Sequence, residues 1–310
     1  GGAEAAPGAD EARRRCGAHS VAGRKAADPG WRCQDTYLVC PLRGRQLLAA
    51  VFDGHGANGQ LAAEGAKQVF QCAAKQVAAP LAPAEAGAFL AALFRQAHAV
   101  LAAAPGAGGQ PMALFAGTTA AAAVVDLAAC TVTSAHAGDS RVAVLEADGR
   151  VAAVTADHTV DEDCEARAKA AGGEVRCAEV GGITARRVFL PGQPFPGIMM
   201  GRSLGDLVAH QLGLLAEPEL ALGLALPHGG AVLLATDGVW EHMATEEAAA
   251  LCTARVADGA APAEAARELV EAAQARWSPL QSDDITAVLV LADGAAAGAA
   301  AELAPEALAK

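Results

Sequence analysis

The chain has 310 residues, and we expect a single domain because large architectures built from two sheets often reach this length. Its formal net charge of −12 excludes a typical nucleic-acid-binding protein, since phosphate backbones require clustered Lys and Arg. Only 4% of the residues are aromatic although 53% are hydrophobic, so alanine and branched aliphatic side chains must fill the core.

The cysteines and the apolar runs bear on the compartment of the protein. Eight cysteines occur singly, without close pairs of zinc-ligand spacing, and we interpret them as small buried hydrophobes in a reducing compartment. No apolar stretch has the length and continuity of a membrane span, and the acidic start of the chain differs from a secretory signal. We therefore expect an intracellular protein, cytoplasmic or nuclear, that does not act on a membrane.

The first third of the chain predicts strands followed by two helices. Residues 1–29 are rich in Gly, Ala and charge, and we expect a partly ordered lead-in. Strand-like runs follow at residues 36–39 and 46–52. Helices are predicted at residues 58–77 and 83–101.

The middle of the chain predicts antiparallel hairpins and an irregular segment. Short runs with β character lie at residues 118–125, 131–135 and 141–145, and their close spacing favours hairpins over helical crossovers. A short helix is predicted at residues 161–171, where a pair of glycines ends it. Residues 175–196 have turn residues without a clean period, which predicts an irregular surface excursion.

The last third predicts two buried strands with helices between them. The strands lie at residues 231–235 and 285–291, and the helices at residues 245–254 and 262–276. The tail, residues 293–310, is rich in alanine and weakly amphipathic, so we expect a terminal helix or a frayed extension.

Four aspartates stand at the edges of strand-like runs: Asp35, Asp53, Asp237 and Asp283. Strand ends allow a rigid scaffold to direct several acids at one point. Carboxylates are the hard oxygen ligands that Mg²⁺ and Mn²⁺ require. For any single residue the preference of Asp for turns is an alternative explanation. As a set, the four aspartates indicate a metal site.

Short motifs surround these aspartates in a fixed order. The first is Asp53-Gly54-His55-Gly56, and the later ones are Gly117-Thr118-Thr119-Ala120, Gly138-Asp139-Ser140-Arg141, Thr155-Ala156-Asp157-His158, Arg202-Ser203-Leu204-Gly205-Asp206, Thr236-Asp237-Gly238 and Asp283-Asp284-Ile285-Thr286. Over roughly residues 30–291 this series resembles the metal-dependent protein serine/threonine phosphatase family of type 2C. Such an ordered series is far more specific than any one motif.

The resemblance implies a fold and an activity. The fold class would be α+β, a four-layer αββα sandwich of two antiparallel β-sheets flanked by helices, with the catalytic domain over residues 30–292. The activity would be hydrolysis of phosphoserine and phosphothreonine in protein substrates. A water activated by two divalent metal ions, Mg²⁺ or Mn²⁺, would attack the phosphorus in line.

The resemblance also implies the ligands of the two ions. Asp53 would bridge them, and the carbonyl of Gly54 would add a ligand to one of them. Asp237 and Asp283 would bind the other ion, while Asp35 would act near the first, directly or through water.

Three further acids lie in the matching motifs. Asp157 matches the position where relatives hold a third, weaker ion together with Asp237. Asp139 and Asp206 match motif acids that we interpret as mainly structural, because turns and outer coordination shells also favour Asp.

The leaving alkoxide needs a proton, and a cation must hold the phosphate. His55, two residues beyond Asp53, is the candidate general acid, while a ligand or turn role is the alternative. His158 is a weaker candidate. Arg32 resembles the family arginine that binds the substrate phosphate, but its spacing to the metal-site aspartate is short, so Arg24 and Lys25 remain competitors.

Gln34 and Asp284 depart from the family pattern, and one segment occupies the place of a family element. Gln34 stands where many relatives have a glutamate, which predicts weaker metal binding. Asp284 replaces a commoner asparagine and either offsets that lost charge or faces solvent. Residues 175–197 occupy the place of the family's mobile flap beside the active site.

Two rival functions share the same motifs. A pseudophosphatase would be a binding or regulatory module without catalysis, and it should lack core ligands, all of which are present here. A hydrolase of small phosphorylated metabolites would use the same metal site. We expect phosphoproteins as partners, no nucleic acid, and a monomer.

Overall fold

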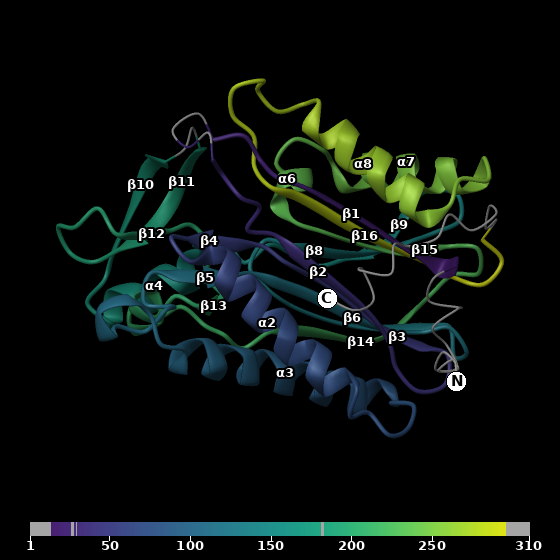
Figure 1. The fold of residues 1–310 in the computed structure, drawn as a ribbon, viewed down its shortest axis with the longest axis horizontal. Coiled ribbons are helices and arrows are strands. Elements are labelled where there is room, and N and C mark those ends of the chain that lie inside the picture. The colour runs from purple at the N-terminus through teal and green to yellow at the C-terminus, as the bar shows by residue number, and fades with distance from the viewer. Residues whose placement is uncertain (1–13, 26–27, 29, 181–182, 296–310) are drawn as a thin grey trace.

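The computed structural model describes residues 14–25, 28, 30–180 and 183–295. Residues 1–13 of the predicted lead-in and most of the predicted tail lie outside the described residues. Two five-stranded antiparallel sheets lie face to face at the centre of the described chain (Figure 1). The first sheet has the order β1 (Cys16–Val21), β16 (Ile285–Leu291), β15 (Ala231–Ala235), β8 (Arg141–Leu145) and β9 (Val151–Val154). The second has the order β14 (Glu219–Ala225), β7 (Thr131–Ala137), β6 (Ala120–Asp126), β3 (Gln46–Phe52) and β2 (Thr36–Pro41).

Helices cover the outer face of each sheet (Figure 1). The helices α2 (Gly59–Ala74) and α3 (Pro83–Ala103) pack on the second sheet, and α7 (Thr245–Ala257) and α8 (Pro262–Gln274) pack on the first. The predicted four-layer αββα sandwich is therefore confirmed. Each predicted long helix is present, with ends shifted by a few residues.

The core consists mainly of alanine and aliphatic side chains, as the composition predicts. Between the sheets, Val51 and Val125 of the second sheet pack in one cluster with Val232 and Val288 of the first. Aromatic rings occur where the second sheet meets its helices, with the Phe52 and Phe70 ring centroids 5.1 Å apart in an edge-to-face contact. Burial of each such side chain contributes about 1.5–3 kcal/mol.

The cysteine prediction is only partly correct. Cys16, Cys164 and Cys252 are buried, but Cys72, Cys130 and Cys177 are exposed. The expectation of uniformly buried cysteines is therefore wrong, because singly spaced cysteines carry no signal about which face of an element they occupy.

The expectation that no segment has the composition of a membrane span also needs correction. The helix α3 is long and apolar enough to cross a membrane by length and composition alone. Its apolar face, which includes Leu90, Phe94 and Leu101, is buried in the cluster that α3 shares with α2 and the second sheet. This packing is that of a core helix.

The lead-in contains a regular strand that the sequence did not predict. β1 pairs with β16 over six residues, from Cys16 opposite Val290 to Val21 opposite Ile285. The small residues of β1 hide the alternation of apolar and polar side chains that is typical of a strand. Close packing requires Gly17, because a Cβ there would lie 2.0 Å from the backbone nitrogen of Ala263 in α8. The partly ordered lead-in is thus, over these residues, an edge strand covered by a helix.

Shorter elements surround one end of the sandwich (Figure 1). A small sheet is formed by β4 (Gly54–Gly56), β5 (Ala116–Thr118) and β13 (Leu204–Gly205). A second is formed by β10 (Glu174–Val180), β11 (Ile183–Phe189) and β12 (Pro196–Ile198). The short helices are η1 (Ala107–Gly109), α4 (Glu162–Ala170), α5 (Leu207–Gln211) and α6 (Asp237–Trp240).

The hairpin of β10 and β11 overturns the prediction of an irregular excursion at residues 175–196. The two strands pair in continuous register, with Val175 opposite Val188 and Arg176 opposite Arg187. Val188 is buried in a small cluster with Cys164 of α4, and Val175 packs against it. Charged residues interrupt the hydrophobic pattern of both strands, so the period of two was hidden in the sequence.

Candidate active site

The predicted metal-site aspartates converge where strands of the two sheets end. Asp53 follows β3, Asp237 is the first residue of α6 after β15, and Asp283 precedes β16. All three line a cleft of about 400 Å³, together with Gly54 and His55. The sequence prediction of a common site therefore agrees with this arrangement of residues far apart in the chain.

Asp35 is buried next to the cleft. Only 8% of the residue is exposed, and its Oδ2 accepts a hydrogen bond of 2.8 Å from the hydroxyl of Thr236. Burial, followed by the charge of Asp284, raises the pKa of Asp35 to about 8. The carboxyl group is thus placed where ionisation requires an additional positive charge.

Burial and neighbouring carboxylates also raise the pKa values of the acids that line the cleft. Burial raises the pKa of Asp53 well above its usual range, and the carboxylates of Asp237, Asp35 and Asp283 raise it further. Burial also raises the pKa of Asp237, and the charge of Asp283 is the next largest cause. Several acids that raise one another's pKa values form a strongly negative centre.

This centre fits divalent cations. The Oδ1 atoms of Asp35, Asp139 and Asp237 are buried without a hydrogen-bond partner. In the described part of the chain, no three His, Cys, Asp or Glu side chains are grouped closely enough to hold a metal ion by themselves. The ammonium of Lys25 lies 2.7 Å from Asp283 Oδ1 and pairs with this acid. Unpartnered hard oxygens with excess negative charge are the donor set that Mg²⁺ or Mn²⁺ takes.

Gly54 is required by close packing at the floor of the cleft. Its backbone nitrogen donates to the carbonyl of Gln34, 3.3 Å away, and a Cβ would lie 2.3 Å from the carbonyl oxygen of Gly59. Only glycine therefore allows β4 to approach the start of α2 so closely.

Asp157 lines one pocket with Asp237, the residue with which it is predicted to hold a third ion. Both carboxylate oxygens of Asp157 lie 2.7 Å from the guanidinium of Arg141, so that its charge is already paired. Asp139 and Glu241 line the same pocket as Asp157 and Asp237. Burial raises the pKa of Asp139 to about 6 and that of Glu241 to about 7. The sequence analysis did not single out Glu241, although it follows Asp237 by one helical turn.

His55 forms a pair with Asp206. Its Nε2 lies 2.6 Å from Asp206 Oδ2, while its Nδ1 is buried without a hydrogen-bond partner. Burial lowers the pKa of His55, but the Asp206 carboxylate more than offsets this, and the net pKa is raised. This contact with the candidate acid adds to the mainly structural role expected for Asp206, and no sequence signal predicts it.

His158 lies outside the cleft lining. Its Nδ1 accepts a hydrogen bond of 3.2 Å from the backbone of Gly138, and its ring stacks on His136 with the centroids 4.2 Å apart. These contacts indicate that His158 has a structural role, in packing and hydrogen bonding.

The three basic residues that are candidates for binding the substrate phosphate differ in their position relative to the cleft. Lys25 lines the cleft, whereas Arg32 is exposed and does not. Arg24 is also exposed, and its backbone pairs with Ser282. Burial lowers the pKa of Lys25, but Asp283 and neighbouring acids raise it above its ordinary value, so the ammonium stays charged.

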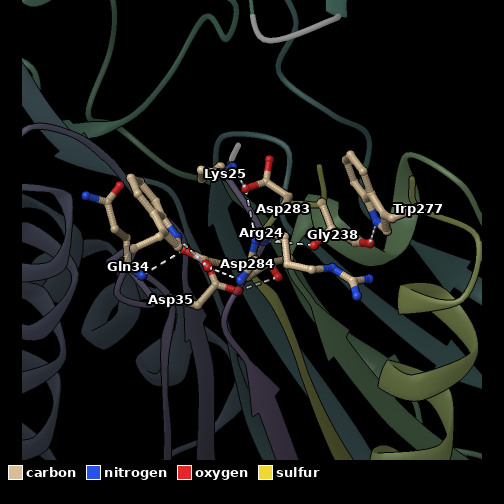
Figure 2. A network of polar contacts seen from close by, with 12 residues as sticks. Arg24, Lys25, Gln34, Asp35, Gly238, Trp277, Asp283 and Asp284 are labelled. Atoms are coloured by element: carbon tan, nitrogen blue, oxygen red, sulfur yellow. Dashed lines mark hydrogen bonds and ion pairs between the residues drawn. The ribbon is translucent and has the colours of Figure 1, made fainter. Parts of the chain in front are cut away.

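Asp284 holds the segment that carries Lys25 (Figure 2). Its carboxylate is 4% exposed and accepts hydrogen bonds from the backbone of Gly23 at 2.6 Å, the indole of Trp31 at 2.9 Å and the backbone of Gln34 at 2.8 Å. The alternative that Asp284 faces solvent is therefore wrong. The amide of Gln34 lines the cleft and donates to the carbonyl of Gly56, 3.0 Å away.

The fold and the site together define a class of protein. A sandwich of two antiparallel sheets with a buried carboxylate centre, a histidine–aspartate pair and a cation in one cleft is typical of metal-dependent hydrolases. The sequence model of the family described as protein phosphatase 2C matches residues 36–279. The chain belongs to this family.

Named relatives support the assignment. The chain is 34% identical over 163 residues to probable protein phosphatase 2C 72 of Arabidopsis thaliana, an alignment that covers 50% of this chain and 48% of the relative. It is 35% identical over 170 residues to probable protein phosphatase 2C 12 of Oryza sativa subsp. japonica, with 53% and 41% covered. The matches thus span about half of these curated relatives or less.

Solved structures support the fold. A serine-threonine phosphatase 2C from Toxoplasma gondii matches with a TM-score of 0.68 at 21% identity, covering 89% of this chain and 94% of that one. A C. elegans sex-determining protein matches with the same TM-score and identity, covering 89% and 64%. At this identity the likeness concerns the architecture alone.

Proposed function

We propose that the chain is a protein serine/threonine phosphatase that hydrolyses phosphoserine and phosphothreonine with two divalent metal ions, Mg²⁺ or Mn²⁺. The observation that carries the proposal is the convergence of Asp53, Asp237 and Asp283 in one cleft, with unpartnered carboxylate oxygens around it. Phosphoproteins are the proposed substrates.

The acids and the carbonyl at the cleft floor are the proposed ligands. Asp53 and the Gly54 carbonyl would hold one ion with Asp35 near it, and Asp237 and Asp283 would hold the other. When bound, the ions supply a water of lowered pKa and neutralise charge on the phosphoryl oxygens. For a third ion, Asp237 remains the expected ligand.

At the third-ion position, Asp139 and Glu241 are better placed than Asp157. The carboxylate of Asp157 is occupied by Arg141, whereas Asp139 Oδ1 has no partner. Asp139, Asp157 and Glu241 line the same pocket. A third ion would bind the carboxylates that are not already paired with a cation.

The other residues of the cleft handle the proton and the phosphate. His55 holds a proton for the leaving alkoxide, and Asp206 fixes the imidazole through Nε2. Lys25, the cation at the cleft wall, binds the phosphoryl group in place of Arg32, which is exposed. No observation favours the pseudophosphatase, because each predicted core ligand is present at the site.

The test is phosphate release from phosphothreonine peptides with Mn²⁺ or Mg²⁺, with EDTA added, and for Asp53→Ala. We expect release by the wild-type protein with metal, and loss of release with EDTA and in the variant. Phosphate release from the wild-type protein that is no greater than from Asp53→Ala would contradict the enzyme function and favour the binding module.

A further inference from the structure

Arg187 is a buried cation in the wall of the cleft. It lies on β11, in the hairpin that the sequence analysis took for an irregular excursion, and it lines the same cleft as His55 and Lys25. Only 7% of the residue is exposed. Its Nη1 donates to the carbonyl of Gly197 at 2.9 Å, while its Nε is buried without a hydrogen-bond partner.

No carboxylate lies within ion-pair distance of Arg187 among the described residues. Its neighbour across the hairpin is another cation, Arg176, which pairs with Glu174 at 3.3 Å. The adjacent Arg186 pairs with Glu165 on the other side of the hairpin. Burial accordingly lowers the pKa of Arg187, and only the more distant charge of Glu241 opposes this effect.

A buried guanidinium without a carboxylate is costly, since desolvation of a charge is recovered only through a partner of opposite charge. The planar group offers donors that match the oxygens of a phosphate. A group of this kind beside the carboxylate centre can therefore bind an anion that the cleft admits.

We infer that Arg187 forms a phosphoryl-binding subsite of the cleft, which takes the phosphate monoester of the substrate or inorganic phosphate and links the β10–β11 hairpin to the bound ligand. The subsite rests on the proposed phosphatase function for its physiological ligand. Lys25 approaches the cleft from the N-terminal segment and Arg187 from the hairpin, so the two cations are supplied by different parts of the fold.

The experiment measures the binding of inorganic phosphate by isothermal titration calorimetry in Mg²⁺. Arg187→Gln keeps a side-chain N–H for the carbonyl of Gly197 but removes the charge. We expect phosphate to bind about tenfold more weakly or worse, as the loss of a charge-assisted hydrogen bond predicts. Arg186→Gln, on the same strand, is the matched control and should bind phosphate as the wild-type protein does.

Unchanged phosphate binding by Arg187→Gln would overturn the subsite, and so would an equal loss in Arg186→Gln. Thermal melting establishes that each variant is folded, and Arg187→Met, which also removes the charge, replaces the glutamine variant if that one does not fold. The peptide assay separates the two hypotheses. A wild-type protein that releases no phosphate refutes the proposed function, whereas the calorimetric difference decides the subsite independently.

Discussion

Asp206 reaches His55 from a backbone conformation that few residues adopt. Its φ of +46° lies in the left-handed region, where Asp and Asn are tolerated better than most side chains. From there Oδ2 accepts hydrogen bonds of 2.6 Å from both His55 and Ser203, and the residue is 2% exposed. The backbone and the hydroxyl thus fix the carboxylate that orients the candidate acid.

Replacing Asp206 by Asn should slow the reaction without unfolding the protein. Asn accepts the same φ but carries no charge, so the pKa of His55 should fall and the imidazole should lose its proton more readily. We expect kcat for a phosphothreonine peptide to fall about tenfold, with a smaller loss for p-nitrophenyl phosphate, whose leaving group barely needs a proton.

The matched comparison for this prediction is His55→Gln, which should show the same difference between the two substrates. Steady-state kinetics on both substrates measures the effect. Equal losses on the peptide and on p-nitrophenyl phosphate would show that Asp206 acts through the fold and not through the acid.

At the level of single residues, the motifs predicted which acids meet in the cleft but not which residues contact them. Asp53, Asp237 and Asp283 could be selected because each lies in a short motif next to a strand. Lys25 could be named only as one of three basic candidates and Arg187 not at all, because the lining of the cleft brings together segments far apart in the chain. A lone basic residue in a sequence gives no indication of which cleft it will line.

The N-terminal segment is an element held in place by one carboxylate. Strand β1 enters the first sheet beside β16, and the chain then crosses the edge of the cleft. Asp284, directly before β16, accepts three hydrogen bonds from this crossing, as Figure 2 shows. The position of Lys25 over Asp283 therefore depends on Asp284.

Replacing Asp284 by Asn should loosen this segment. The amide keeps one acceptor oxygen and presents an N–H₂ group to a backbone donor, so at least one buried hydrogen bond is lost, at a cost of about 1–3 kcal/mol. We expect faster hydrogen exchange at the amides of Gly23 and Gln34, measured by mass spectrometry or NMR. Asp148→Asn, an exposed change, is the control.

Exchange at Gly23 and Gln34 that remains at the wild-type rate in Asp284→Asn would contradict this role. A second consequence follows if Lys25 binds the phosphoryl group. The variant should then raise the KM for phosphopeptide more than it lowers kcat, because the cation is displaced while the carboxylate centre stays in place.

Elements with a strong hydrophobic period were predicted well, and those without it were missed. The strand β3 and the helix α2 have continuous apolar patterns, and both were placed within a few residues. The strands β1 and β10 contain small or charged residues, so their pairing partners determine them more than their own sequences do. β14 was also missed, and this strand exposes Leu220 and Leu222 to 40% and 51%.

On the scale of the whole molecule, the packing of the two sheets buries charge where strands of both sheets end. The chain has a formal net charge of −12, and when no metal ion is bound, burial and mutual repulsion raise the pKa values of the acids in its cleft. The metal-free protein is therefore strained by the same residues that would bind the ions. Cations bound to the folded state should relieve this strain by mass action.

The stability of the metal-free protein should consequently fall as the pH rises from 5 to 8. Asp35 has a folded pKa of about 8 against an ordinary value of 3.8, so the unfolded chain loses this proton first and unfolding becomes easier with rising pH. One such group changes the free energy of unfolding by up to about 1.4 kcal/mol per pH unit. Asp35→Asn removes the charge while an amide oxygen can still accept from Thr236, so its melting temperature should exceed that of the wild-type protein by a margin that grows toward pH 8. Thermal melting in EDTA measures this difference in melting temperature. Mg²⁺ should stabilise the wild-type protein at pH 8 more than at pH 5. A difference in melting temperature between the two proteins that stays constant across this pH range would contradict the argument.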